Sequence, residues 1–196
     1  ATDTLQIKFV HNDYYAKNVD DRNNFRITQD STETDVIYSN EVRFEIKKTD
    51  EKLPYIQIEK EAQGKSLSEA KQRAEQIRYN YKIIGNQLIL DNYLLTDLKN
   101  KFADQEIEVT LYLPQGTLFK ADSSVQNYDR SNDEFFNLHY SSDKYLYKVM
   151  DNKAKCLDCP TDENDYDDVE KNNNQFIWPP LLLLLRYFVL RTLQGY

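Results

Sequence analysis

Tyr79-Asn80-Tyr81-Lys82-Ile83-Ile84-Gly85-Asn86-Gln87-Leu88-Ile89-Leu90-Asp91 is the stretch of the sequence that most clearly predicts a fold element. Gly85-Asn86 suits the two-residue loop of a type I′ or II′ β-turn between two strands. Closing the hairpin there sets Ile83 opposite Leu88 and Tyr81 opposite Leu90, so all four side chains share one face. Turn chemistry and apolar pattern agree, and together they predict an antiparallel pair of strands.

Similar strand patterns occur on both sides of this hairpin. Apolar and polar residues alternate over residues 5–9, 42–46, 56–58 and 107–113. Half-buried strands have this period because successive side chains point to opposite faces of a sheet. The pattern predicts a mainly β protein, built either as a short β-solenoid or as a two-layer β-sheet domain.

One segment breaks the strand pattern and predicts a capping α-helix near residues 66–78. Ser66-Leu67-Ser68-Glu69 matches the capping box, in which the Ser and Glu side chains satisfy each other's backbone donors. Leu67, Ala70, Ala74 and Ile77 then follow at helical spacing and form a narrow apolar stripe. We expect this helix to lie on the sheet or to close one end of it.

Length and composition suggest one domain followed by two unusual segments. The 196 residues are 40% hydrophobic and 30% charged, which is enough to build a core, and the net charge of −8 disfavours nucleic-acid binding. We expect a mainly β domain over residues 1–150, an acidic, Asn-rich linker over 151–176, and a Leu-rich apolar tail over 177–196. The chain starts at Ala1 without an initiator Met or a signal sequence, so we expect a processed product or a fragment.

The apolar tail raises the question of membrane contact. A helix over residues 181–194 would be about 21 Å long at ~1.5 Å per residue. A bilayer core needs roughly 30 Å. The tail is therefore too short to span. Three alternatives stay open: it lies at the membrane interface, it packs against protein, or it does not belong to the natural domain.

Cys156 and Cys159 form a single C-x-x-C motif. A structural zinc site needs four ligands, so a metal centre would have to add His139 and a carboxylate. A redox role is disfavoured by the acidic residues that follow, because they would raise the thiol pKa. A local disulfide or two unreactive thiols is the favoured interpretation, and we predict no resident metal or cofactor.

Aromatic residues gather in the loop-like segment before the motif. Tyr128, Phe135, Phe136 and Tyr140 could form an exposed interaction surface, or they could cover a small core beneath a long loop. Nucleophile elbows and phosphate-binding loops do not occur in the sequence, and neither histidine has a serine or cysteine context. The sequence therefore predicts a protein that is not an enzyme.

Four segments, residues 56–71, 79–93, 105–119 and 155–159, resemble the C-terminal region of bacterial PspC-domain (phage shock protein C) membrane proteins. The resemblance implies a region outside the cytoplasm, in the periplasm or at the surface, anchored to the membrane in the full-length protein. It also implies likeness to adhesin-like β-solenoid domains and a non-catalytic role in envelope stress or surface association.

Two functions follow as hypotheses. The first is an envelope module that binds protein, glycan or its own copies, with membrane contact through residues 177–196. The alternative is a metal- or redox-dependent module centred on Cys156 and Cys159.

Overall fold

The computed structural model describes residues 4–12, 25–131, 134–136, 138 and 145–159, and three β-sheets contain their strands. The largest has six strands in the order β12-β11-β10-β1-β7-β6. Its strands are β1 (Leu5–Val10), β6 (Tyr81–Ile84), β7 (Gln87–Asp91), β10 (Leu118–Ala121), β11 (Tyr147–Val149) and β12 (Ala154–Cys156). A three-stranded sheet has the order β4-β9-β5, from β4 (Val42–Thr49), β9 (Glu106–Pro114) and β5 (Tyr55–Glu61). A second three-stranded sheet, β2-β3-β8, contains β2 (Phe25–Gln29), β3 (Asp35–Ser39) and β8 (Leu94–Asp97).

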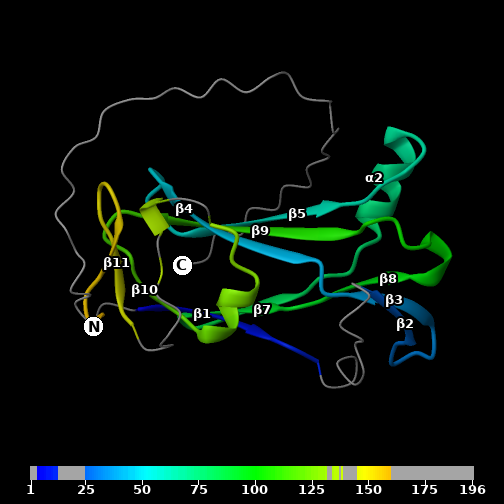
Figure 1. Cartoon of the computed structure of the whole chain (residues 1–196), viewed down its shortest axis with the longest axis horizontal. Helices are drawn as coiled ribbons and strands as arrows, with labels where there is room; N and C mark the ends of the chain where they lie inside the picture. Colours follow the sequence, from blue (N-terminus) through cyan, green and yellow to red (C-terminus); the bar gives the residue numbers. More distant parts are fainter. Residues whose placement is uncertain (1–3, 13–24, 132–133, 137, 139–144, 160–196) are drawn as a thin grey trace.

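The six-stranded sheet and the β4-β9-β5 sheet enclose one hydrophobic core. In Figure 1, β4, β9 and β5 form the upper layer, and β1 and β7 run below them. Alternate residues of both sheets point inward, so Ile7 and Phe9 of β1 share a buried cluster with Phe44 of β4 and Val109 of β9. The rings of Phe9 and Phe44 meet edge to face, with centroids 5.8 Å apart.

Strand pairing within these layers is mixed. β1 runs parallel to both β7 and β10, and β4 runs parallel to β9, whereas β5–β9 and β6–β7 are antiparallel. The mainly β class is therefore confirmed, and the layers correspond to the two-layer arrangement. The uniform coils of a solenoid are not confirmed by this topology.

The hairpin has the predicted register, with Ile83 opposite Leu88 and Tyr81 opposite Leu90. Gly85 has φ +58, a left-handed conformation that glycine adopts without strain. The four side chains share one face as predicted, but Ile83 is 55% exposed whereas Leu88 and Leu90 are buried. The reason is that β6 is the edge strand of its sheet, where less protein covers the inner face.

The predicted helix is α2 (Leu67–Glu75), which lies beside β5 at one end of the layers (Figure 1). Ser66 caps it by accepting a hydrogen bond from the Glu69 amide at 3.2 Å. The Glu69 carboxylate accepts from the Lys65 amide and not, as predicted, from that of Ser66. Gly64 lets the chain approach the helix, because a Cβ there would lie 2.4 Å from the Ala70 backbone nitrogen.

Three 3-10 turns complete the described chain, and the folded part extends further than the sequence suggested. The 3-10 turns are η1 (Leu98–Asn100), η2 (Ser123–Asn127) and η3 (Glu134–Phe136). We expected a linker from residue 151, but β12 pairs antiparallel with β11 and belongs to the six-stranded sheet. The error arose because β12 has only three residues within an acidic run. The rest of the expected linker and the apolar tail, residues 160–196, lie outside the described residues.

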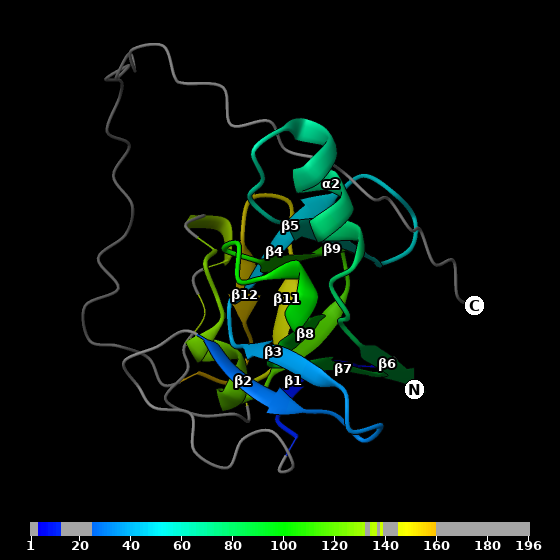
Figure 2. The same cartoon turned by 90° about the vertical axis from the view of Figure 1, so that its right-hand side faces the viewer.

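The β2-β3-β8 sheet, at the front in Figure 2, is joined to the rest through Asp30. The Asp30 carboxylate accepts hydrogen bonds from Thr32 and from the Thr34 amide, and it pairs with Arg78 at 3.0 Å. Arg78, which follows α2, also pairs with Asp97 of β8 at 3.4 Å. This network connects the β2–β3 turn to the chain that leaves the helix.

Asp30→Asn is expected to lower the melting temperature at neutral pH. Hydrogen bonds from Thr32, and then the Arg78 contact, hold the pKa of Asp30 well below its ordinary value of 3.8. A lowered pKa in the folded state means that ionised Asp30 stabilises the fold above pH 3.8, and that this stabilisation is lost as the pH falls below it. Melting curves of both proteins across the acid range should therefore converge below pH 3.8. A difference in melting temperature that stays constant into strong acid would contradict the role of the carboxylate charge.

Candidate interaction surface

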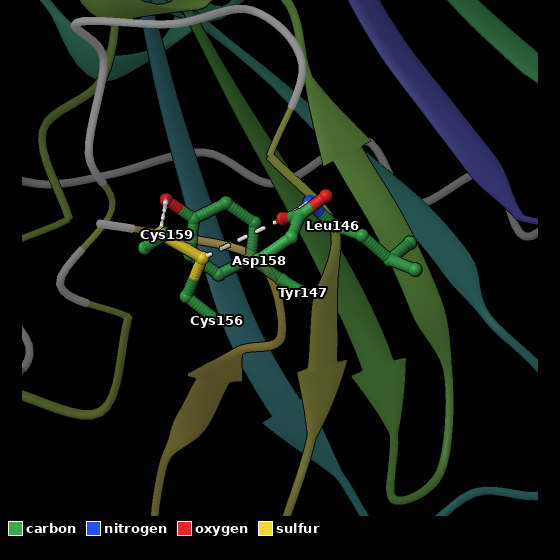
Figure 3. The surroundings of a disulfide bond; sticks show 5 residues. All are labelled: Leu146, Tyr147, Cys156, Asp158 and Cys159. Carbon is green, nitrogen blue, oxygen red and sulfur yellow. Dashed lines mark hydrogen bonds between the residues drawn. A yellow bond between two sulfur atoms is a disulfide. The ribbon is translucent and has the colours of Figure 1, made fainter. Parts of the chain in front are cut away.

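The C-x-x-C motif forms a disulfide at the end of β12, beside the start of β11 (Figure 3). The chain around it is fixed by two further contacts to Leu146, just before β11. Asp158 Oδ1 accepts from the Leu146 amide at 2.7 Å, and the Leu157 amide donates to the Leu146 carbonyl at 2.8 Å. The Tyr147 hydroxyl lies 3.9 Å from Cys159 Sγ. The disulfide therefore closes the turn that ends the six-stranded sheet.

Of the two states that the sequence left open, a local disulfide or two unreactive thiols, the structure has the disulfide. Zinc binding needs thiolate ligands, and in the disulfide state neither Cys156 nor Cys159 can supply one. His139, the third residue of the candidate metal site, lies outside the described residues. Among the described residues around the disulfide, nothing supports a metal- or redox-dependent module.

The aromatic residues singled out from the sequence mostly pack inward. Phe136 is 2% exposed and lies against Phe119, so it covers the core and is not part of an exposed surface. Phe135 is half-buried beside it. Tyr128 is also half-buried, and its ring centroid lies 4.4 Å from that of Phe9. Tyr140 lies outside the described residues.

A polar groove of about 580 Å³ runs along β4 and ends at Tyr128. The segment after η2 forms its far wall, since the Phe44 amide donates to the Tyr128 carbonyl and the Arg130 amide donates to the Phe44 carbonyl. The groove is lined by Asn40, Glu41, Val42, Arg43, Glu45, Lys47, Glu108, Asn127, Tyr128 and Arg130. Of these residues, the sequence pattern had indicated only Tyr128 as a candidate interaction residue.

Most of the charged groove residues come from the outward positions of the β4-β9-β5 sheet. Arg43 Nε pairs with Glu106 at 2.7 Å, and Lys47 pairs with Glu45 at 2.6 Å. These positions are the polar partners in the alternating patterns at 42–46 and 107–113, so the signal was present in the sequence. Placing them side by side requires the parallel register of β4 with β9, in which Arg43 is opposite Glu108.

A family model for the Toast-rack domain found in some PspC proteins matches residues 28–162. The chain belongs to this family. The match runs from β2 through the disulfide, so the Toast-rack domain includes β12 and its turn, and it bears out the resemblance to PspC C-terminal regions. No curated protein and no solved structure matches the chain. Within the described part of the Toast-rack domain, every helix is too short or too polar to cross a membrane.

The outward face of the β4-β9-β5 sheet makes the Toast-rack domain acidic on one side. Glu59 is directly opposite Glu108, and Glu61 is directly opposite Glu106. Burial raises the pKa of Glu106, the Arg43 guanidinium lowers it, and the carboxylates of Glu61 and Glu108 raise it again. Carboxylate oxygens of Glu59, Glu61 and Glu108 lie within 4.8 Å of one another. Such a group is unfavourable at neutral pH because like charges face each other across the strands.

Glu59→Gln in the Toast-rack domain is therefore expected to raise the free energy of unfolding at neutral pH by roughly 0.2–1 kcal/mol. The amide oxygen of the new side chain can still accept from Gln57, which donates to Glu59 at 2.6 Å. Urea unfolding at neutral pH would measure this change in the free energy of unfolding. Glu45→Gln is the matched control on the same face, and it should lower stability because Glu45 is paired with Lys47. A higher free energy of unfolding for Glu45→Gln, or no increase for Glu59→Gln, would argue against carboxylate repulsion.

Proposed function

We propose that this Toast-rack domain is a non-catalytic cell-envelope module of a PspC-type membrane protein. It stands on the extracytoplasmic side, in the periplasm or at the surface, and acts in envelope stress or surface association. The observation that carries the proposal is the Cys156–Cys159 disulfide in a domain of a PspC-associated family. Disulfides persist in oxidising compartments such as the periplasm and the cell surface, and are rare in the cytosol.

The module acts by contact and not by a reaction. The groove along β4 offers Arg43, Lys47 and Arg130 together with Glu45 and Glu108, a mixture that suits a polar partner. The partner is a protein or glycan of the envelope, or a second copy of the chain. Adhesin-like attachment and membrane contact through residues 177–196 belong to the same proposal.

Protease accessibility tests the extracytoplasmic placement. Cells that make the full-length membrane protein are converted to spheroplasts and treated with a protease that cannot enter, with a cytoplasmic protein as the control. The domain should be degraded or released while the cytoplasmic control survives. Protection of the domain until the cells are lysed would reject the extracytoplasmic location.

A further inference from the structure

The register of the six-stranded sheet gathers lysines on its outward face. Lys82 of β6 and Lys8 of β1 both lie opposite Ile89 of β7, one on each side of it. Lys120 of β10 is opposite Gln6 of β1. Each of these lysines alternates with an inward residue of the core, such as Ile7, so all of them point away from the core.

The same face continues to the far edge of the sheet. Lys148 of β11 is opposite Leu118 on one side and opposite Lys155 of β12 on the other. Two lysines directly opposite each other are unfavourable unless an anion lies near them. Among the described strand residues of this face, Asp91 is the acid that accompanies the five lysines.

Exposed apolar side chains accompany this charge at both edges of the sheet. Ile84 of β6 is 59% exposed, and it is opposite Gln87 on the lysine-bearing face. Leu157 is 48% exposed and directly follows β12, at the other edge of the sheet. A surface that combines lysines with exposed aliphatic side chains is typical of proteins that lie on anionic membranes.

The two outward faces of the domain differ in charge. The β4-β9-β5 sheet presents the glutamates described above on the other side of the shared core. An anionic surface would therefore attract the outward face of the six-stranded sheet and repel the outward face of the β4-β9-β5 sheet. This difference fixes the orientation of the domain although the whole chain carries a net charge of −8.

We propose that the outward face of the six-stranded sheet, called here the lysine face, docks on an anionic lipid bilayer. From Lys82 on β6 to Lys155 on β12 the sheet has five strand spacings, or roughly 24 Å at about 4.8 Å each. Lysines spread over this width can contact several lipid headgroups at once, whereas a single small anion could not contact all of the lysines. The inference rests on the proposed envelope role only in that the role gives the domain access to a bilayer.

Vesicle co-sedimentation of the full chain tests this docking. Vesicles are made of phosphatidylcholine alone or of phosphatidylcholine mixed with phosphatidylglycerol, at low and at high salt. The chain should bind the mixed vesicles at low salt and be released by high salt, because screening weakens attraction between exposed charges. The combined variant Lys82→Glu, Lys148→Glu, Lys155→Glu should partition roughly 100-fold more weakly, since each lysine near an anionic membrane contributes about 1 kcal/mol.

Lys52→Glu, Lys65→Glu and Lys101→Glu, combined in one chain, give the matched control. These lysines are exposed in turns and just after η1, outside the lysine face, and the change in net charge is the same. The control should retain most of the binding, and residues 177–196 are identical in every chain compared. Circular dichroism of each variant checks that it is folded.

Three results would overturn the proposal. They are equal binding to neutral vesicles, an equal loss in both triple variants, and self-assembly of the chain without lipid that only the lysine-face variant loses in sedimentation velocity. The last would assign the face to a second copy of the chain. Because the assay uses no cells, its failure would leave the protease result on location unaffected.

Discussion

Phe44→Ala is expected to lower the free energy of unfolding by about 3–5 kcal/mol, because it empties the space between the two main sheets. Phe44 is 0% exposed, and its ring meets Phe9 from the opposite layer. Its strand β4 is parallel to β9 on one side, while the backbone of Phe44 bonds to Tyr128 and Arg130 on the other. The surroundings are held from both sides, so they cannot collapse freely into the cavity.

Urea unfolding followed by circular dichroism measures this loss. Phe25→Ala is the matched control. Phe25, in the β2-β3-β8 sheet, stacks on Phe102 with ring centroids 3.9 Å apart, but it is only half-buried. Phe25→Ala should lower the free energy of unfolding by clearly less than Phe44→Ala. Equal costs at the two positions would mean that the two main sheets do not share one rigid core.

Replacing both Cys156 and Cys159 by serine is expected to cost about 2 kcal/mol on the chain-entropy account of a very short loop. The two residues are separated by three positions, so the bond restricts only a small part of the unfolded chain. The loss should be concentrated at β11 and β12, because the turn that the disulfide closes holds these two strands at the sheet edge.

Thermal unfolding with and without a dithiol reductant separates this effect from the substitutions themselves. The reductant should bring the unmodified chain close to the double-serine variant, and it should leave the variant unchanged. Hydrogen exchange should show faster opening of residues 147–149 and 154–156 in the variant. If the variant is as stable as the unmodified chain, the disulfide is not a structural element of the fold.

Local features of this fold could be read from the sequence because their determinants lie within a few residues. Gly85 and Asn86 specify the hairpin turn, and a two-residue loop leaves one register for the strands beside it. Ser66 and Glu69 likewise mark the start of α2. In both cases the pattern and the backbone chemistry point to the same structure.

Long-range features could not be read in the same way. β1 pairs in parallel with β7 and β10, which are more than 75 positions away in the sequence, and no local pattern specifies that choice. The sequence left open whether Phe136 is exposed or covers a core, because its burial against Phe119 of β10 is a tertiary contact. β12 was hidden in an acidic run for the same reason, since its pairing with β11 is a tertiary contact.

The charged faces show where this limit matters for function. Each lysine of the lysine face is unremarkable within its own strand, as is each glutamate of the opposite sheet. The lysines form one surface only because the register of five strand pairs places them on the same face of the sheet. An interaction surface of this kind leaves no motif in the sequence, unlike a catalytic site.

Alkylation of Cys156 and Cys159 in intact cells, with metal analysis of the purified protein, tests most directly whether this domain works by contact outside the cytoplasm. Cells are quenched in acid, free thiols are blocked, and the protein is then reduced and labelled with a heavy maleimide. We predict that both cysteines take the label only after reduction and that the protein carries no stoichiometric zinc. Two thiols that are free before reduction, together with one zinc per chain that is lost on Cys156→Ser, would contradict the account.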